Sequence, residues 1–109
     1  MFKAIILLTR RADMTHEEFA EWWLVEHAPL AAQLPGVRRL CFNLVEPSGD
    51  AAVDAAAPDG VSELWFDSKA DFEAAYATEI GTSVAADSIA HLASRVRMFA
   101  TEHEVVAGE

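Results

Sequence analysis

The stretch THEEFAEWWLVEHAPLAAQLPG, residues 15–36, decides what the first half of this chain can form. Thr15 is a good N-cap, and Glu18 three residues later completes a capping box. Phe19 and Trp23 then repeat at helical spacing, which places their side chains on one stripe. The stretch therefore predicts an amphipathic helix that packs its apolar stripe against another layer of the protein.

A histidine and a proline interrupt this pattern. His27 follows Trp23 by four residues and so falls on the apolar stripe. Pro29 has no backbone N–H to donate, and its ring crowds the carbonyl of Val25. We therefore expect a kink or break at residues 26–28, followed by a short second helix that begins at Pro29.

The segments around this helix complete an α+β pattern. Apolar runs predict strands, and Ser68 with Asp71 gives a capping signal for a further helix. The expected strands are 2–9, 37–46, 61–66 and 96–106, and the expected later helices are 69–77 and 84–96. The order strand, helix, strand, strand, helix, strand is typical of a ferredoxin-like βαββαβ fold, an antiparallel sheet with helices on one face.

The strands carry more apolar side chains than helices on one face can cover. In strand 37–46 the side chains of Leu40 and Phe42 share one face, whereas those of Cys41 and Asn43 share the other. The face without helices would carry Ile5, Leu7, Cys41, Val45 and Trp65. Because such a face must be buried, we expect a second copy packed against it, which makes the protein a homodimeric α+β barrel.

Residues 47–60, PSGDAAVDAAAPDG, are long for a connection between two strands. Two prolines, two glycines and many alanines are typical of a flexible insert, and this is the prediction. A lid over the mouth of a pocket is the alternative.

Composition limits the class of protein. The 109 residues fit one domain over 1–109, and the single cysteine excludes an internal disulfide. With 18 acidic and 8 basic residues the net charge is −10, which argues against nucleic acid and anionic membranes as partners. No apolar run approaches the ~20 residues that a membrane helix needs, and the first residues lack the pattern of a signal peptide. We therefore expect a cytoplasmic protein.

Several of these stretches together resemble the EthD family of dimeric α+β barrel proteins. The resemblance rests on a first strand that ends in basic residues, then MTHEEFAEWWLVEHAPLA, then LPGVRR leading into a strand with Asn43. The later SELWFDSKADFEAAYAT and RMFATEHEVV are similar to the family's third strand, second helix and last strand. The insert at 47–60 matches no motif of the family.

This resemblance implies a small-molecule substrate and chemistry without a metal or organic cofactor. Relatives include a methylmuconolactone methylisomerase and enzymes that decarboxylate or dehydrate aromatic polyketides, and similar barrels house polyketide cyclases and haem-degrading monooxygenases. The family histidine of the first helix matches His27, within EHAPL, and the strand asparagine matches Asn43. These two are the predicted catalytic residues.

Both residue types suit proton transfer next to a carbonyl group. An imidazole has an ordinary pKa near ~6.5, so His27 can move protons at neutral pH; alternatively, it bonds the carbonyls freed by Pro29. Asparagine is uncommon in strands, so Asn43 either holds a developing enolate oxygen or bonds a neighbouring main-chain group. The helix break is expected to aim the His27 ring from the helix side toward the interior of the barrel.

Four further residues are candidates for substrate binding. Arg39 would neutralise a substrate carboxylate or else form a salt bridge, and Cys41 would line the site or fill the core. Trp23 and Trp65 would wall a pocket for a planar ring or else belong to the core. The histidines form no compact motif, and Asp87 with His91 four residues on is only a fragment of one, so no metal site is predicted.

These observations lead to three hypotheses of function. The first is a cofactor-independent enzyme of isomerase, lyase or cyclase type that moves a proton on a small aromatic, lactone or polyketide-like compound in a catabolic or tailoring pathway. The second is a non-catalytic small-molecule-binding or accessory protein of a degradation cluster. The third is a cofactor-free monooxygenase.

Overall fold

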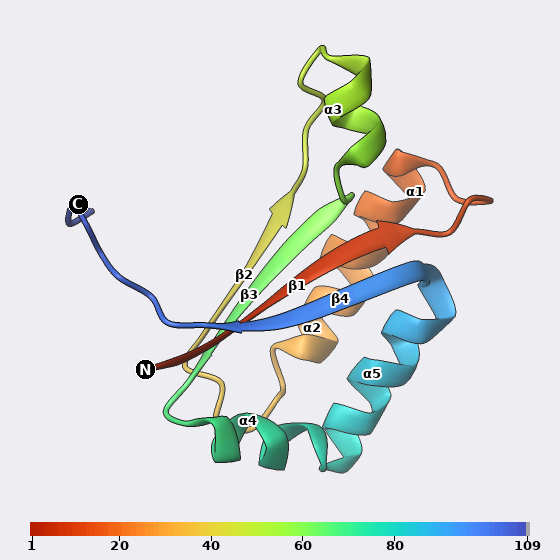
Figure 1. Ribbon diagram of the computed structural model, residues 1–109. Coiled ribbons are helices and arrows are strands. Elements are labelled where there is room, and N and C mark those ends of the chain that lie inside the picture. Colours follow the sequence, from red (N-terminus) through yellow and green to blue (C-terminus); the bar gives the residue numbers. More distant parts are fainter. Residues whose placement is uncertain (109) are drawn as a thin grey trace.

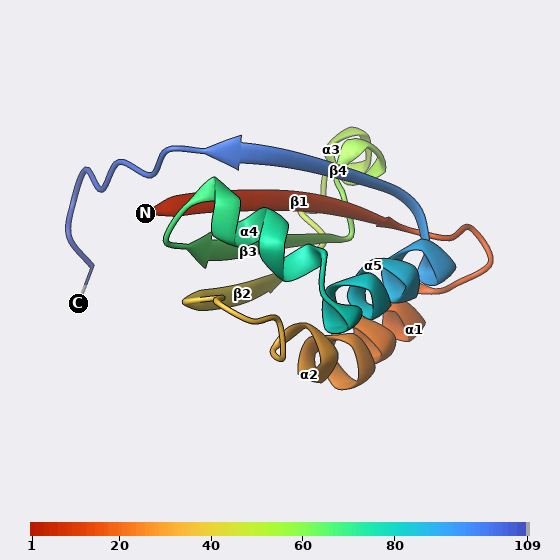
Figure 2. The same cartoon turned by 90° about the horizontal axis from the view of Figure 1, so that it is seen from below.

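A four-stranded antiparallel sheet forms one layer of the protein, and most of the helices form the other (Figures 1 and 2). The computed structural model describes residues 1–108. The strands are β1 (Phe2–Arg10), β2 (Arg39–Leu44), β3 (Gly60–Phe66) and β4 (Leu92–Ala100), and the helices are α1 (His16–Glu21), η1 (Trp22–His27), α2 (Ala28–Ala31), α3 (Ala51–Ala56), α4 (Lys69–Tyr76) and α5 (Glu79–His91). The strand order β2-β3-β1-β4, with every neighbour antiparallel, confirms the predicted ferredoxin-like fold.

Strand alternation sorts the side chains between the two faces of the sheet. Ala4, Ile6 and Leu8 of β1 point toward the helices and are buried, and Leu64 and Phe66 of β3 lie beside them. The largest fully buried side chains belong to this helix-side core: Trp23, Phe19, Phe66 and Phe72. One core thus lies between the sheet and the layer of α1, η1, α2, α4 and α5 (Figure 2).

The break predicted at 26–28 is absent, whereas the short second helix predicted at Pro29 is present as α2 and begins one residue earlier, at Ala28. The six residues of η1 form a π-helix, and the N–H of Ala28 donates to the carbonyl of Trp23 five residues back. This wider turn accommodates a residue without an N–H while the helix continues into α2. It also leaves Trp22, Trp23 and His27 all buried on the inner side of the helix.

The boundaries predicted for the last helix and strand are wrong. The sequence analysis expected them at 84–96 and 96–106, whereas α5 starts at Glu79 and β4 runs from Leu92 to Ala100. Thr78 caps α5 by accepting the N–H of Gly81, where a Cβ would collide with the backbone of Ala75 and Tyr76. Gly81 therefore lets α5 begin directly against α4. Within residues 1–108, no helix has the length and apolar character that crossing a bilayer requires.

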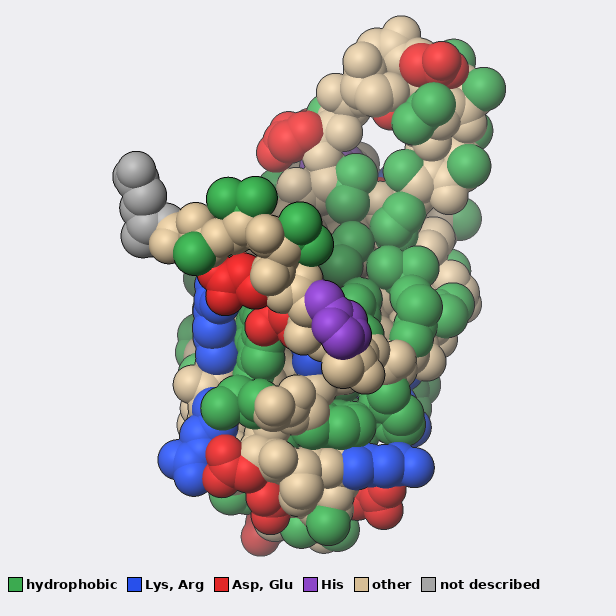
Figure 3. Space-filling view, turned by 60° about the vertical axis from the view of Figure 1, so that its left-hand side comes forward, with side chains coloured by type: hydrophobic (Ala, Val, Ile, Leu, Met, Phe, Trp, Pro, Cys, Tyr) green, Lys and Arg blue, Asp and Glu red, His purple; other side chains and the backbone are tan. Residues whose placement is uncertain are grey.

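The insert at 47–60 forms local hydrogen-bonded structure, including a helix that the sequence did not predict. It contains α3, whose N-cap Asp50 accepts the N–H groups of Ala52 and Val53. Asp54 accepts hydrogen bonds from both the N–H and the hydroxyl of Ser48, which closes the loop before the helix. Every residue of α3 is exposed, and the helix projects beyond the ends of β2 and β3 (Figures 1 and 3). It does not cover the cavity described below.

The face of the sheet opposite the helices is uncovered in the single chain, as the sequence analysis expected. Its β1–β4 half is apolar, and Val96 and Met98 of β4 are 53% and 41% exposed beside Leu7 and Ile5. Hydrophobic side chains also reach the surface in the space-filling view, in an area that continues up to α3 (Figure 3). We refer to this side of the sheet as the open face.

Gly60 gives a test of the packing between β3 and η1. A Cβ at this position would come within 2.6 Å of the Trp23 ring. Gly60→Ala should therefore lower the free energy of unfolding by about 1–3 kcal/mol, measured by urea denaturation, because the buried ring must shift. Gly108→Ala, where a Cβ meets nothing within 4 Å, is the matched control and should leave stability unchanged. Equal stability of the two variants would contradict close packing at Gly60.

Candidate functional site

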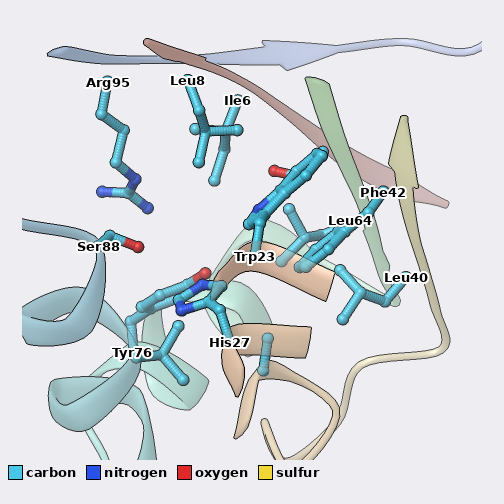
Figure 4. A pocket seen from close by; sticks show the side chains of 13 residues that line it. Ile6, Leu8, Trp23, His27, Leu40, Phe42, Leu64, Tyr76, Ser88 and Arg95 are labelled. Carbon is cyan, nitrogen blue, oxygen red and sulfur yellow. The ribbon is translucent and has the colours of Figure 1, made fainter. Parts of the chain in front are cut away.

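A narrow cavity lies between the sheet and the helices, and His27 lies at its helix side (Figure 4). Its volume is about 20 Å³, enough for a water molecule. The walls come from every layer of the fold: Ile6, Leu8, Trp23, His27, Ala31, Leu40, Phe42, Ser62, Leu64, Tyr76, Val84, Ser88 and Arg95. The cavity therefore combines an apolar lining with a few polar groups, which is typical of small-molecule sites.

His27 is paired with a carboxylate from another helix. Its Nδ1 lies 2.7 Å from Oδ2 of Asp87 on α5. Because a carboxylate only accepts hydrogen bonds, Nδ1 carries the proton, and the neutral ring keeps its free electron pair on Nε2. No hydrogen bond within residues 1–108 reaches Nε2, and the ring lines the cavity. This arrangement orients an imidazole that can accept a proton from a molecule in the cavity.

Asp87 is itself held in place by two more aromatic side chains. The indole N–H of Trp22 donates to the same Oδ2 at 3.2 Å. His91, one turn further along α5, has its Nδ1 2.8 Å from the carbonyl of Asp87 and stacks on Trp22 with ring centroids 4.4 Å apart. The carboxylate thus accepts from both Trp22 and His27, so its orientation toward His27 is fixed by the packing of α5 against η1.

The surroundings of His27 keep its imidazole neutral. The side chain is only 4% exposed, and this burial lowers the pKa of His27 below the ordinary value of 6.5. The hydrogen bond to Asp87 opposes that shift, and the positive charge of Arg95 adds to it. Since the folded pKa is lowered, His27 contributes stability above pH ~6.5 that is lost as the pH falls through its folded pKa.

Hydrogen-bond donors face His27 around the cavity. The indole N–H of Trp23 is fully buried and has no partner among residues 1–108, and its nitrogen lies on the cavity side of the ring (Figure 4). Tyr76 lies beside His27, and Arg95 extends from β4 toward Ser88 (Figure 4). Burial raises the pKa of the Tyr76 phenol, which keeps its proton available for donation. The site therefore offers one free base opposite several donors.

Asn43 lies on the other side of the sheet from His27. Its neighbours Leu40 and Phe42 line the cavity, whereas its own amide donates to the carbonyl of Val61 and to Oε1 of Glu63, both at 3.0 Å. The amide is thus satisfied by the protein, which was the alternative in the sequence analysis. Within one chain the two predicted catalytic residues cannot contact the same molecule, and the expected approach of His27 to the barrel interior is wrong because the sheet stands between.

The other predicted binding residues are likewise divided between the two sides of the sheet. Trp23 lines the cavity and stacks on Phe42 with ring centroids 4.4 Å apart. Trp65, Arg39 and Cys41 belong to the open face, where Trp65 lies under Arg39 at 4.6 Å and is only 6% exposed. Figure 4 accordingly shows Trp23 with His27 and none of the other three.

Charged groups cover Trp65 on the open face. The ammonium of Lys3 lies 2.8 Å from Glu63 and 3.2 Å from Glu102. These contacts raise the pKa of Lys3 and lower the pKa values of both carboxyl groups, so all three stay charged at neutral pH. Residues 1–108 contain no cluster of three or more His, Cys, Asp or Glu side chains suited to holding a metal ion.

Comparison with known proteins identifies the family. The EthD domain family matches residues 11–95, which include His27, Tyr76, Asp87 and Arg95. The chain belongs to the EthD family. This confirms the resemblance found in the sequence.

Individual relatives share the EthD fold over nearly the whole chain. The chain is 29% identical over 108 residues to an uncharacterized 11.0 kDa protein from the thcB–thcC intergenic region of Rhodococcus erythropolis, covering 97% of this chain and 98% of the relative. An EthD family protein from Bacillus halodurans superposes with a TM-score of 0.77 at 22% identity, covering 94% and 99% of the two chains. A dimeric ferredoxin-like protein of unknown function from Thermobifida fusca gives 0.70 at 19%, covering 93% and 90%. SnoaB, a cofactor-independent oxygenase from Streptomyces nogalater, gives 0.69 at 14%, covering 98% and 97%.

The sequence analysis did not predict three residues that lie close to His27 in the structure. Asp87 is separated from His27 by 60 residues and was noted only as part of an incomplete metal motif with His91. Arg95 was expected in a helix, whereas it lies in β4. The alternation of strand residues therefore could not be used to predict which face of the sheet its side chain points to. Tyr76 was not singled out as a site residue in the sequence. The one available signal was the helical spacing of Asp87 and His91, which placed a carboxylate on the inner side of α5.

The pKa of His27 tests the pairing with Asp87. Histidine NMR titration of the wild type should give His27 a pKa below the ordinary value of 6.5, because burial disfavours the imidazolium. Asp87→Asn should lower the His27 value further, since it removes the anion that favours the charged ring. Glu104→Gln, in the exposed C-terminal segment, should leave His27 unchanged. A His27 value that stays constant or rises in Asp87→Asn would show that the pair does not exist in solution.

Proposed function

We propose that this EthD protein is a cofactor-independent enzyme that moves a proton on a small aromatic, lactone or polyketide-like compound. His27 acts as general acid and base, and Asp87 is a positioning residue that fixes the tautomer and orientation of the ring. The observation that carries this proposal is the 2.7 Å contact between Nδ1 of His27 and Asp87, with Nε2 left free at the cavity. A histidine needed only for structure would more often have both nitrogens bonded to the protein.

The proposed step is proton transfer at a carbon next to a carbonyl group. Nε2 of His27 takes the proton, the electrons of the broken C–H bond form a C=C bond, and the carbonyl π electrons move to the oxygen, which gives an enolate. The partnerless N–H of Trp23 is placed to donate to that oxygen. Return of the proton from Nε2 to a different carbon completes an isomerisation, and loss of a leaving group from the enolate gives a lyase reaction.

Two other functions have specific support. A non-catalytic accessory role is favoured by the small size of the cavity, about 20 Å³, which admits no substrate unless side chains move. A cofactor-free monooxygenase is favoured by the fold shared with SnoaB, which is described as a cofactor-independent oxygenase. The three functions differ in what they do to a test compound: exchange of a proton, binding alone, or consumption of oxygen.

We also propose that the protein is a homodimer in which two open faces pack together. The support is the exposed apolar half of the open face and the dimeric state of the similar protein from Thermobifida fusca. Asn43, Arg39, Cys41 and Trp65 would then lie inside the barrel formed by the two sheets, where Asn43 and Glu63 stay paired. Their role there is to stabilise the assembly, separately from the chemistry at His27.

Turnover of the His27 variants tests the proposed chemistry. Wild-type protein is screened in D2O by NMR with a muconolactone, an aromatic β-keto acid and an electron-rich polyhydroxylated aromatic, with an oxygen electrode run in parallel. His27→Ala should reduce proton exchange or conversion of the compound used by about 10²–10⁴-fold, since it removes the base. Asp87→Asn should reduce it less and shift the pH profile, because the ring remains but its tautomer is no longer fixed.

The control for this experiment is His103→Gln, which removes an exposed imidazole that does not line the cavity. Folded His27→Ala protein that exchanges protons as fast as the wild type would end the acid–base proposal. Binding without exchange would favour the accessory role, and oxygen uptake that survives in His27→Ala would favour the oxygenase.

The mass in solution tests the dimer. Sedimentation at micromolar concentration should give about twice the chain mass of 11.9 kDa. Met98→Asp, in the middle of the apolar half of the open face, should convert the dimer to monomer by placing charge in the interface. Val53→Asp, on the exposed helix α3, is the control and should leave the dimer intact. A wild-type protein that sediments as a monomer would overturn this part of the proposal.

A further inference from the structure

The few basic side chains of this acidic protein are mostly paired with carboxylates. Five of the eight form ion pairs: Lys3, Arg10, Arg11, Arg38 and Lys69. Arg39 stacks on Trp65. Arg95 and Arg97 have no carboxylate within ion-pair distance among residues 1–108, although acidic residues outnumber basic ones by 18 to 8. Arg39 has no such partner either but lies on the open face, so Arg95 and Arg97 are the unpaired cations of the helix side within residues 1–108.

Both unpaired arginines lie on the helix side of β4. They are paired in register with Leu8 and Ile6, whose side chains face the core, so Arg95 and Arg97 face the helices. Arg95 is half-buried and lines the cavity with His27. None of the side chains that line this cavity is acidic. A guanidinium with five N–H donors therefore reaches a space that contains no protein anion.

A larger groove continues from the cavity along β4. It has a volume of about 420 Å³ and lies between α4 and β4, with Phe72, Phe99 and Arg97 among its walls. Tyr76 lines both the groove and the cavity, so its ring forms the wall between them. The guanidinium of Arg97 lies 5.2 Å from the Phe72 ring and 5.3 Å from the Phe99 ring. Lys69 and Glu73, whose charged groups lie 3.8 Å apart, also line the groove. Aromatic faces, the cation of Arg97 and this internally paired Lys69–Glu73 couple thus surround the space that adjoins the site of His27.

The orphaned donor of Trp23 points to the same kind of ligand. Its N–H is fully buried without a partner, and leaving such a donor unbonded costs about 1–3 kcal/mol. An anionic oxygen in the cavity would accept from Trp23 and from Arg95 together. A cationic ligand would meet the charge of Arg95 with no carboxylate in the cavity lining to offset it.

We propose that the helix side of β4 binds an anionic aromatic compound, with Arg95 as the counter-ion of its carboxylate and the ring lying in the groove beside Arg97. This inference rests on the proposed function and narrows its substrate to acids, because a neutral lactone or ketone has no group for Arg95. Entry requires the Tyr76 ring to turn away from the wall that separates groove and cavity. The local positive charge offsets the repulsion that a protein of net charge −10 exerts on an anion.

The test compares two probes of nearly equal shape, 4-fluorobenzoate and 4-fluorobenzamide, by ¹⁹F NMR titration. Wild-type protein should bind the benzoate at least about tenfold more tightly than the neutral amide, and the benzoate should perturb the signals of Arg95 and Tyr76. Arg95→Gln should remove this preference without changing the affinity for the amide, and Arg95→Lys should restore part of it. Arg39→Gln removes an arginine of the open face and should bind both probes as the wild type does.

Equal affinity of wild-type protein for the two probes, including absence of binding by either, would overturn the inference, as would a benzoate preference that survives in Arg95→Gln. Reduced folding of Arg95→Gln is detected by circular dichroism, and Arg95→Lys then carries the comparison. His27→Ala should keep the benzoate preference. If His27→Ala keeps both the benzoate preference and full turnover, the proton-transfer proposal fails while the anion site stands. If His27→Ala loses turnover but Arg95→Gln keeps the benzoate preference, only the anion site fails.

Discussion

The sheet of this EthD protein acts as a partition, and the rest of the structure depends on it. Every side chain of β1 and β3 is committed to one of two faces by strand alternation, so a residue and its chain neighbour can never serve the same site. The helices cover one face and create a core with a narrow cavity in it. The open face carries the apolar side chains of its β1–β4 half and the charged groups over Trp65. In the function proposed above, proton transfer belongs to the helix side of the four strands and subunit assembly to the open face.

On the helix side, the π-helix η1 determines where the side chains of the first helix point. A proline two residues after His27 would end an ordinary helix, but the wider turn carries the chain past it and leaves Trp22, Trp23 and His27 turned inward. Trp22 then supports Asp87, Asp87 orients His27, and Trp23 lies across the cavity. The strict requirement for glycine at Gly60, which lies against Trp23, follows from the same crowding. The histidine is thus placed by its neighbours in the helix and by a carboxylate from the far end of the chain.

The electrostatics of the two faces differ in the same way. On the open face Lys3, Glu63 and Glu102 neutralise one another over Trp65, which suits a surface that another subunit can bury. On the helix side Arg95 has no such partner, and the burial that lowers the pKa of His27 keeps the base neutral beside it. A free base and an uncompensated cation within one apolar cavity are unusual in a protein this acidic. Together they are what distinguishes this site from ordinary core packing.

The sequence by itself determined the order of elements, the capped first helix, the two faces of strand 37–46 and the family, because helical spacing, capping residues and alternation are local properties of the chain. It also singled out His27 and Trp23. Only the tertiary structure decided that Asn43 lies away from His27, that Asp87, Tyr76 and Arg95 join it, and that Pro29 is absorbed in a π-turn. The contact between His27 and Asp87, 60 residues apart, depends on how α5 packs on η1. The face of the sheet to which Arg95 points depends on where α5 ends and β4 begins. No periodicity within a short window carries that information, since it arises when separate elements meet.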